Sequence, residues 1–426
     1  MLSARTVAVR ILSDIERNLG YSNIAIDSAL NEAKLSKQDS ALVSMLVYGV
    51  LQRKITLDVI LENASGKGFK KTHPYVLNVL RVGAYQLLFT DKIPASAVVN
   101  EAVKTVKSSK QKFASGFVNA LLRKVESEKE SIKSSLDTSK DIGFKYSCTK
   151  ELADLLITDY GYETADLFLK SSLEAPKLFC RDNLFCESKF NPETLTQKGI
   201  EVELNSVNGC FSLKGAGNIE NLSEFKKGMF FVQDLASQTA IAALDIKADM
   251  SVLDVCAAPG GKSFTAAQYV GKEGKVVSCD LYEKRSGLIQ NGAKRLNIGI
   301  VSAIQNDATV FNSSLGTFDR VICDVPCSGL GVIRRKPEIK YKSVADFKQL
   351  AEIQLSILKT SARYLKQDGV LMYSTCTLLK SENRCVVDSF LNENKGFEII
   401  DERTLMPHTD GCDGFYYCIL KRNSCG

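Results

Sequence analysis

The sequence lacks the features that would place it in several specialised classes of protein. No apolar run approaches the about 20 residues that a helix needs to cross a bilayer. Residues 1–10, MLSARTVAVR, have neither the apolar core nor the small-residue cleavage site of a signal peptide. No internal repeat or low-complexity tract is present. We therefore expect a globular protein that has no membrane partner and stays in the cytoplasm.

The cysteines lack any paired pattern. Thirteen of them lie between Cys148 and Cys425, an odd number without the short paired spacings of a zinc cluster or a disulfide framework. This pattern predicts free thiols in a reducing compartment and no bound metal.

The net charge of +6 is unevenly distributed along the chain. Residues 1–125 contain 18 Lys and Arg against 9 Asp and Glu, an excess of +9, so the rest of the chain carries −3. A basic module joined to a nearly neutral one favours a polyanionic partner. A solvated helical surface fits the charge alone equally well.

Apolar periodicity divides the chain into three predicted domains. Residues 1–135 space their apolar side chains by three and four, as in YVLNVLRVGAYQLLF at residues 75–89, and predict an all-α bundle. Residues 142–228 combine a helical stretch with short β-like runs, which predicts a small α+β domain. The charged residues 126–141 between them lack this periodicity and are expected to form a linker.

Residues 229–426 predict a Rossmann-like α/β domain. A regular alternation of strands and helices is expected to start at MFFVQD, residues 229–234. The further expected strands are residues 251–256, 275–280, 301–307, 318–325 and 369–376. Such alternation predicts a parallel sheet with helices on both faces.

A glycine-rich turn follows the strand at residues 251–256. In SVLDVCAAPGGKSF, residues 251–264, the glycines allow close backbone approach and the following helix start favours negative charge. The turn matches neither a P-loop nor the GxGxxG fingerprint, and Lys262 lacks the spacing of a phosphate-binding lysine. In an open parallel sheet this turn lies where ligands bind.

Aspartates end successive predicted strands. Asp280 suits a ribose diol, Asp307 suits the amino group of an adenine, and Asp254 precedes the glycine-rich turn. One such residue alone is more typical of a helix N-cap or a turn. The three together, in order at strand ends, favour an adenosyl group without a triphosphate, which indicates S-adenosylmethionine.

Two cysteines follow neighbouring predicted strands. Cys327 lies in DVPCSGLG, residues 324–331, and Cys376 ends the strand at residues 369–376. Adjacent strands lie about 4.8 Å apart, so both thiols can face one pocket. A lone cysteine is more often a small buried hydrophobe, but the pair, with Asp324 and Pro326, favours a reaction that needs both a nucleophile and a base.

These motifs resemble a known family. DVCAAPGGKS, DVPCSGLG, YSTCT followed by SEN, and VQDLASQTA are similar to the Sun (RsmB) branch of the RNA cytosine-5 methyltransferases. LRVGAYQLLF, IPASAVVNEAV and FVNALLRKV resemble the helical RNA-binding domain of the antitermination factor NusB. The resemblance spans nearly the whole chain.

The resemblance implies roles for the site residues. Cys376 would be the nucleophile that adds to carbon 6 of cytosine, Asp324 would hydrogen-bond nitrogen 3, and Cys327 would assist proton removal and product release. The residues expected to bind S-adenosylmethionine are Cys256, Ala257, Ala258, Pro259, Gly260, Gly261, Lys262, Asp280, Arg285, Asp307 and Asp324.

RNA contacts are expected at two places. IRRKPEIKYK, residues 333–342, follows the catalytic loop and favours phosphate contact over a solvated basic loop. The small domain is expected to add two contacts in LFCRDN, residues 178–183. The expected RNA-binding residues are Arg181, Asn183, Arg334, Arg335, Lys336 and Lys340. Lys336 stands where relatives often carry His, and Asn306 stands where Gly is usual.

The best supported interpretation is that the protein is a monomeric 16S rRNA cytosine-5 methyltransferase that acts on free RNA or an early assembly intermediate. The catalytic motifs also fit a tRNA cytosine-5 methyltransferase, although the NusB-like segment favours rRNA. A non-catalytic RNA-binding assembly or antitermination factor is the alternative of a different class, and the intact thiols and cofactor loop argue against it.

Overall fold

The computed structural model describes residues 3–18, 35–66, 68–91, 93–347 and 349–423. The chain forms two compact units. The helical unit comprises Met1–Glu174 and Ile333–Val344, and the α/β unit comprises Ala175–Val332 and Ala345–Gly426.

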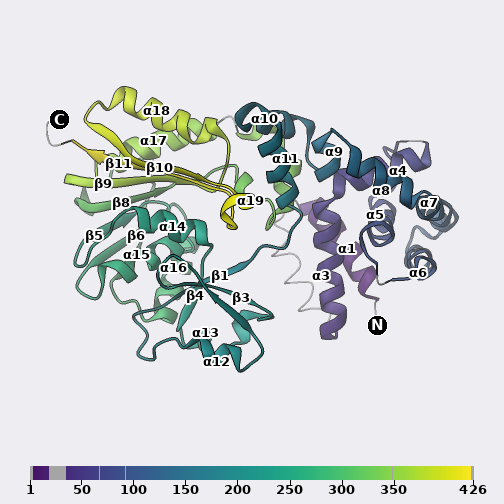
Figure 1. Cartoon of the computed structure of the whole chain (residues 1–426), viewed down its shortest axis with the longest axis horizontal. Coiled ribbons are helices and arrows are strands. Elements are labelled where there is room, and N and C mark those ends of the chain that lie inside the picture. Colours follow the sequence, from purple (N-terminus) through teal and green to yellow (C-terminus); the bar gives the residue numbers. More distant parts are fainter. Residues whose placement is uncertain (1–2, 19–34, 67, 92, 348, 424–426) are drawn as a thin grey trace. The chain divides into compact units, whose positions relative to one another are not determined.

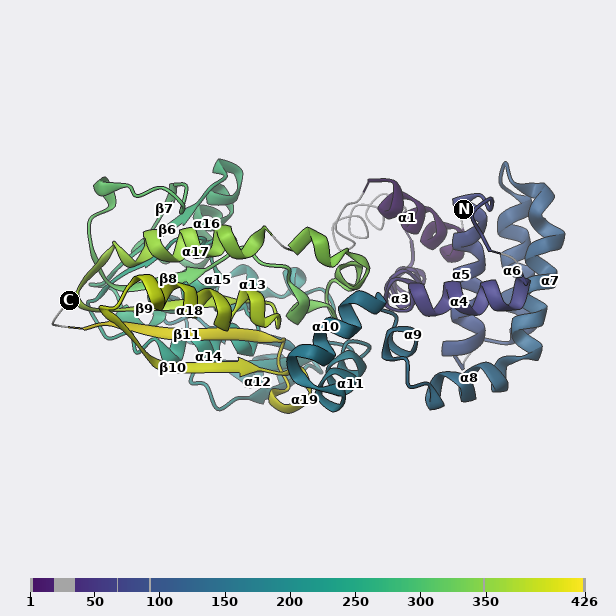
Figure 2. The ribbon, with the colours of Figure 1, turned by 90° about the horizontal axis from the view of Figure 1, so that it is seen from above.

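The helical unit is an α-helical assembly, as its sequence predicts (Figures 1 and 2). Its described α-helices are α1 (Ala4–Asn18), α3 (Lys37–Gln52), α4 (Lys54–Ser65), α5 (Pro74–Phe89), α6 (Ala95–Lys107), α7 (Ser115–Ser127), α8 (Lys129–Thr138), α9 (Ile142–Tyr146), α10 (Lys150–Tyr160) and α11 (Tyr162–Ser171). Local signals set the ends: Ser36 caps α3 by accepting a hydrogen bond from Asp39 N, and Pro74 stands in the first turn of α5. The apolar faces of α1 and α3–α8 form one core.

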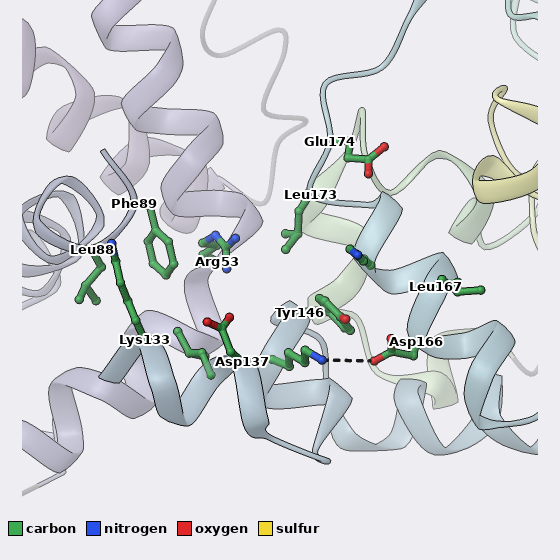
Figure 3. A pocket seen from close by; sticks show the side chains of 13 residues that line it. Arg53, Leu88, Phe89, Lys133, Asp137, Tyr146, Asp166, Leu167, Leu173 and Glu174 are labelled. Atoms are coloured by element: carbon green, nitrogen blue, oxygen red, sulfur yellow. Dashed lines mark ion pairs between the residues drawn. The ribbon is translucent and has the colours of Figure 1, made fainter. Parts of the chain in front are cut away.

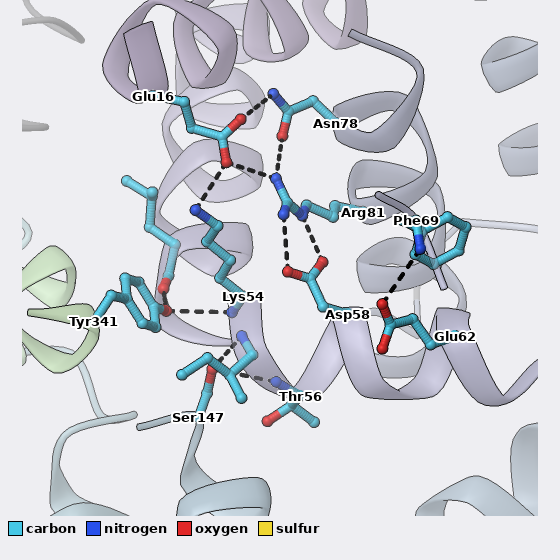
Figure 4. A network of polar contacts seen from close by, with 12 residues as sticks. Glu16, Lys54, Thr56, Asp58, Glu62, Phe69, Asn78, Arg81, Ser147 and Tyr341 are labelled. Carbon is cyan, nitrogen blue, oxygen red and sulfur yellow. Dashed lines mark hydrogen bonds and ion pairs between the residues drawn. The ribbon is translucent and has the colours of Figure 1, made fainter. Parts of the chain in front are cut away.

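A buried arginine ties three helices of this unit together (Figure 4). Arg81 on α5 is 4% exposed and forms two hydrogen bonds with the carboxylate of Asp58, at 2.6 and 2.8 Å. Its Nη1 atom also lies 2.7 Å from Glu16 on α1, which pairs with Lys54 at 2.8 Å. Because a buried charge needs partners, this network fixes α1, α4 and α5 relative to one another.

The expected linker at residues 126–141 is helical. The last turn of α7 and the whole of α8 occupy it. Leu136 is 6% exposed, and Ile132, one helical turn earlier, packs against the same core. Two apolar residues spaced by four are enough for one buried stripe on an otherwise charged helix. The α9–α11 helices, expected in the small α+β domain, belong to the helical unit.

The α/β unit contains a small antiparallel sheet. Its strands are β1 (Leu178–Asp182), β2 (Glu201–Leu204), β3 (Cys210–Lys214) and β4 (Phe230–Val232), in the order β2-β3-β1-β4. The helices beside it are α12 (Pro192–Thr196) and α13 (Ser223–Lys226). The prediction that residues 229–234 open the large sheet is wrong, because β4 pairs with β1 instead.

The large sheet has seven strands in the order β10-β11-β9-β8-β5-β6-β7. They are β5 (Ser251–Asp254), β6 (Lys275–Asp280), β7 (Val301–Gln305), β8 (Phe318–Asp324), β9 (Leu365–Thr375), β10 (Phe397–Leu405) and β11 (Phe415–Arg422). The five strands β5–β9 run parallel, as predicted, whereas β11 joins β9 antiparallel and β10 joins β11 antiparallel. The sheet is therefore mixed.

Helices cover both faces of this sheet (Figure 1). One face packs against α14 (Leu235–Ala243), α15 (Gly261–Val270) and α16 (Glu283–Leu296), and the other against α17 (Leu350–Ala362) and α18 (Arg384–Glu393). A short helix, α19 (Pro407–Asp410), precedes β11. No helix among the described residues is long and apolar enough to span a membrane.

Candidate active site

Two neighbouring parallel strands bring the two predicted thiols together. Asp324, at the end of β8, pairs in register with Ser374 near the end of β9. Cys327 lies in the turn after β8, and Cys376 directly follows β9. Their Sγ atoms lie 3.3 Å apart, within hydrogen-bonding distance for sulfur. The carboxyl edge of the sheet therefore presents two thiols as one contiguous group.

The environment of Cys327 raises the pKa of its thiol. The hydrogen bond with Cys376 is the largest influence in this direction, and burial adds to it. A thiolate is the nucleophilic form of cysteine, and the thiolate of a high-pKa thiol is also a strong base, so the pair can supply both a nucleophile and a base.

Asp324 lies beside the thiols and is held at both oxygens. Lys262 Nζ, on α15, donates to Oδ2 at 2.7 Å, and Ser374 Oγ donates to Oδ1 at 2.9 Å. Burial lowers the pKa of Lys262, but the negative groups around it, Asp324 first and then Asp254 and Cys376, together raise it above its usual value. A permanent ammonium close to Cys376 favours the thiolate.

The turn that carries Cys327 is fixed from behind by residues that the sequence analysis did not assign to the site. Ser328 N donates to Glu382 Oε2 at 2.9 Å, and Gln354 Nε2 donates to Pro326 O at 2.9 Å and to the same carboxylate oxygen at 2.8 Å. Glu382 is 1% exposed. Its position in the SEN motif is the sequence signal that could have identified it, whereas Gln354 carries no such signal.

A close backbone contact anchors the end of this turn. Gly331 N donates to Cys376 O at 2.9 Å, and Gly414 N donates to Gly331 O at 2.9 Å. A Cβ atom at Gly331 would overlap the carbonyl of Gly414. Glycine is therefore required at residue 331, so that the catalytic turn can touch the segment that leads into β11.

The predicted cofactor loop joins β5 to α15. Gly260 has φ +112°, and a Cβ atom there would overlap the Phe264 ring, so only glycine fits. No side chain caps the start of α15, which leaves its first N–H groups without a capping acceptor. Pro259 is exposed, Cys256, Ala258, Gly261 and Lys262 are half-buried, and Ala257 is buried. The loop offers donors suited to a carboxylate ligand.

The predicted aspartates lie at the ends of β5 and β6 and after β7. Asp280 is 3% exposed and accepts hydrogen bonds from Ala258 N at 3.3 Å and Tyr282 N at 3.2 Å. Arg285 lies 3.6 Å from Asp280 and donates to Ala258 O at 3.0 Å. Asp307 is exposed and accepts from Thr309 N and Oγ1. Both carboxylates therefore accept hydrogen bonds within the turns in which they lie. The sequence had left this turn-forming role open as the alternative to ligand binding.

Asp254 is a buried carboxyl group with an unused acceptor. It is 1% exposed, and its Oδ2 atom accepts a hydrogen bond from Ser263 Oγ at 2.7 Å. Its Oδ1 atom has no hydrogen-bond partner among the described residues. Burial raises the pKa of Asp254 to about 7, and the charge of Asp324 adds to this effect.

The raised pKa of Asp254 predicts a pH-dependent stability. In an unfolded chain the pKa of aspartate is about 4, so between about pH 4 and pH 7 the folded protein keeps a proton that the unfolded chain loses. The stability from this group is full below about pH 4 and is lost as the pH rises through 7. Asp254→Asn should flatten this fall by at most about 3 kcal/mol between pH 5 and pH 8.

The measurement is urea unfolding of the unliganded protein, followed by circular dichroism at both pH values. Asp249→Asn is the matched control, because Asp249 is exposed in the same unit. An Asp254→Asn protein with the same pH slope as the control would contradict the assigned protonation of Asp254.

Two RNA contacts expected in the small sheet are buried. Asn183 is 3% exposed, and its amide donates to Gly228 O at 2.8 Å and to Leu296 O at 2.7 Å. Its role is structural, so the prediction of an RNA contact there is wrong. Arg181 is 4% exposed, donates to Gln238 at 3.3 Å and lies over the Tyr269 ring at 5.0 Å. Its burial weakens the case for RNA contact.

The basic segment after the catalytic turn differs most from expectation. Lys340 is 0% exposed, and its Nζ atom donates to Gln52 O at 2.7 Å and Tyr146 O at 2.9 Å. Burial lowers its pKa to about 7. The prediction that Lys340 contacts RNA is therefore wrong. Arg334 is also buried, whereas Arg335 and Lys336 are half-buried and their RNA contact stays a prediction.

The helical unit contains a cavity of about 620 Å³ that holds none of the predicted site residues (Figure 3). The Arg53 guanidinium lies over the Phe89 ring at 4.0 Å, and Lys145 lies 3.7 Å from Asp166. The charged lining residues are Arg53, Lys133, Lys145, Lys170, Asp137, Asp166 and Glu174. The lining carries both signs of charge, so the cavity is not a uniformly positive surface.

Comparison with known proteins assigns the family. The family model described as 16S rRNA methyltransferase RsmB/F matches residues 241–421, and the NusB family model matches residues 2–127. The chain is 36% identical over 442 residues to the probable ribosomal RNA small subunit methyltransferase B of Bacillus subtilis (strain 168), covering 99% of both chains. This chain belongs to the ribosomal RNA small subunit methyltransferase B family. A relative from Synechocystis sp. is 31% identical over 99% of this chain and 100% of its own.

Solved structures agree with this membership at the level of fold. The crystal structure of PH0851 matches with a TM-score of 0.82 at 23% identity and covers 99% of both chains. NSun6 from Pyrococcus horikoshii matches with a TM-score of 0.59 at 20% identity, over 64% of this chain and 98% of that chain. The predicted fold classes, an all-α NusB-like N-terminal region and a Rossmann-like methyltransferase region, are confirmed. Among the described residues no cluster of His, Cys, Asp or Glu is arranged to hold a metal ion.

Proposed function

We propose that this protein transfers a methyl group from S-adenosylmethionine to carbon 5 of a specific cytosine in 16S rRNA, through a covalent adduct with Cys376. The observation that carries the proposal is the Cys327–Cys376 pair, with Sγ atoms 3.3 Å apart beside a fixed carboxylate. Methyl transfer to an amine would need neither thiol. Membership of the small subunit methyltransferase B family supports rRNA as the substrate.

The cofactor loop has a donor and acceptor set that fits S-adenosylmethionine. The uncapped start of α15 suits the carboxylate of the methionyl group, and the unpartnered Oδ1 atom of Asp254 is a polar atom near the same loop. Asp280 suits the ribose diol and Asp307 the adenine amino group. When bound, the cofactor supplies an electrophilic methyl group.

The chain itself must make cytosine nucleophilic. The Cys376 thiolate adds to carbon 6, the 5,6 double bond shifts its electron pair toward carbon 5, and nitrogen 3 takes a proton from solvent water. The Asp324 carboxylate then accepts a hydrogen bond from that N–H group and stabilises the adduct. Lys262 and Ser374 fix the carboxylate at the required position before the substrate arrives.

The product must then leave the enzyme. After methylation, carbon 5 carries both the methyl group and its original proton. The Cys327 sulfur, as thiolate, takes that proton, the double bond re-forms, and the carbon 6–sulfur bond breaks to expel the Cys376 thiolate, while nitrogen 3 returns its proton to solvent. The influences that raise the pKa of Cys327 also make its thiolate a stronger base. Glu382 and Gln354 hold the turn that presents this base.

Bisulfite sequencing of total RNA from cells with and without this protein tests the proposal. We expect one cytosine of 16S rRNA to resist conversion only when the protein is present. Protection of a tRNA cytosine instead would reassign the substrate, and an unchanged pattern across all RNAs would reject cytosine-5 methylation.

A further inference from the structure

A short segment after the catalytic turn belongs to the helical unit, although the chain on both sides of it belongs to the α/β unit. This segment is Ile333–Val344, called the strap below. It contains a 3-10 helix at Pro337–Tyr341. Its side chains Ile333 and Ile339 are buried, at 1% and 4% exposed.

The strap caps the carboxyl end of α3. The last carbonyl groups of a helix have no partner within the helix. Lys340 Nζ donates to the carbonyl of Gln52, the last residue of α3, and the Tyr341 hydroxyl donates to the carbonyl of Leu51. The protonated form of Lys340 also suits the helix dipole at this end. Two strap side chains therefore do the work of a helix C-cap from a distant part of the sequence.

Further bonds hold the strap at several points, and Figure 4 shows those of Tyr341. Lys340 Nζ donates to Tyr146 O at 2.9 Å, and Thr149 N donates to Lys340 O at 3.2 Å. The Tyr341 hydroxyl accepts from Lys54 N at 3.2 Å, at the first residue of α4. Lys54 in turn pairs with Glu16 in the Arg81 network. The strap is thus bonded, through Lys54, to the polar network of Arg81 in the helical unit.

We propose that the strap is a tether through which the helical unit restrains the catalytic turn, and that Lys340 and Tyr341 are positioning residues for methyl transfer. Ile333 follows Cys327 by six positions, and six residues span at most about 20 Å. Fixing one end of so short a connection limits the conformations open to the turn at its other end. The inference rests on the proposed methyl transfer, and it gives the helical unit a part in the chemistry in addition to RNA binding.

Lengthening the connection tests the tether without removing any contact. We insert Gly-Ser-Gly-Ser between Val332 and Ile333, which leaves the strap contacts and the Cys327 turn with their own partners. The control places the same insertion between Gly316 and Thr317, an exposed turn of the α/β unit. The single-turnover methyl-transfer rate on 16S rRNA should fall about tenfold to 100-fold for the first insertion and stay unchanged for the second.

Point variants separate positioning from RNA contact. Tyr341→Phe removes only the hydroxyl, and Lys340→Met removes the buried donor; Lys342→Met is the matched control because Lys342 is exposed. We expect a lower single-turnover rate with RNA Kd unchanged within about twofold. If Lys340→Met does not fold, the rates of Tyr341→Phe and of the insertion variant still test the tether. Weaker RNA binding with an unchanged rate would overturn the tether and restore the strap as an RNA contact.

Amide hydrogen exchange provides a readout that does not need activity. The amides of Ser328 and Gly331 are bonded to Glu382 and to Cys376 O. Their protection should fall in the Val332–Ile333 insertion and persist in the control insertion. Unchanged protection together with an unchanged rate would overturn the tether. An inactive wild-type protein would reject the proposed function. The amide exchange of the two insertion variants would then be the only test of the tether.

Discussion

Cys376→Ser is expected to lower the single-turnover methyl-transfer rate by at least about 1,000-fold. A serine hydroxyl in the same position is not ionised near neutral pH and is a far weaker nucleophile toward carbon 6 than a thiolate. The nearby Lys262 ammonium favours a thiolate but cannot make an alkoxide at neutral pH. The measurement is transfer of a labelled methyl group to 16S rRNA with enzyme in excess.

The matched control for this variant is Cys385→Ser. Cys385 is an exposed thiol on α18, and its replacement should leave the rate unchanged. RNA binding and thermal unfolding of Cys376→Ser should match wild type, which separates loss of chemistry from loss of structure. A Cys376→Ser protein that keeps more than about a tenth of the wild-type rate would show that another group attacks the base.

Cys327→Ala is expected to trap the protein on its RNA. Without a base to take the carbon 5 proton, the carbon 6–sulfur bond cannot break, so the methylated adduct persists. Multiple-turnover activity should fall by about 100-fold or more, while one methyl group per enzyme is still transferred. The adduct is measured as a protein band shifted by RNA on a denaturing gel, and RNase treatment should collapse the shift.

The double variant Cys327→Ala/Cys376→Ala is the control for the trapped species. It should give no shifted band, because the sulfur that forms the bond is gone. If Cys327→Ala alone also gives no band and Cys376→Ala gives one, the roles of the two thiols are reversed. The 3.3 Å separation of the two sulfurs makes this test necessary, since distance alone does not distinguish them.

The sequence predicted the carboxyl edge of the sheet well because its signals there are local. Asp324 and Cys376 end recognisable apolar strands, and strands of one parallel sheet end at the same edge. The pairing of Asp324 with Ser374 in the structure follows that rule. The glycine at residue 260 could likewise be identified, because its need for φ above zero is a property of one turn.

Long-range packing set the features that the sequence did not reveal. Lys340 has its acceptors at residues 52 and 146, far from it along the chain, so a basic segment looked like a solvated or RNA-facing loop. Gln354 is an ordinary residue of α17 until the fold brings the Cys327 turn to it. The apolar run of β4 is compatible with either sheet, so the sequence does not predict which one it joins. In the structure β4 pairs with β1 and belongs to the small sheet.

The backbone contact between Gly331 and Gly414 has a consequence for sequence variation in this family. Neither residue can acquire a side chain while the other stays in place, because the two main chains touch. The two positions should therefore evolve as one unit, and a chain with alanine at residue 331 should be found only with a rebuilt C-terminal hairpin. The segment leading into the last strand is therefore under the same sequence constraint as the catalytic turn, although it carries none of the reactive groups.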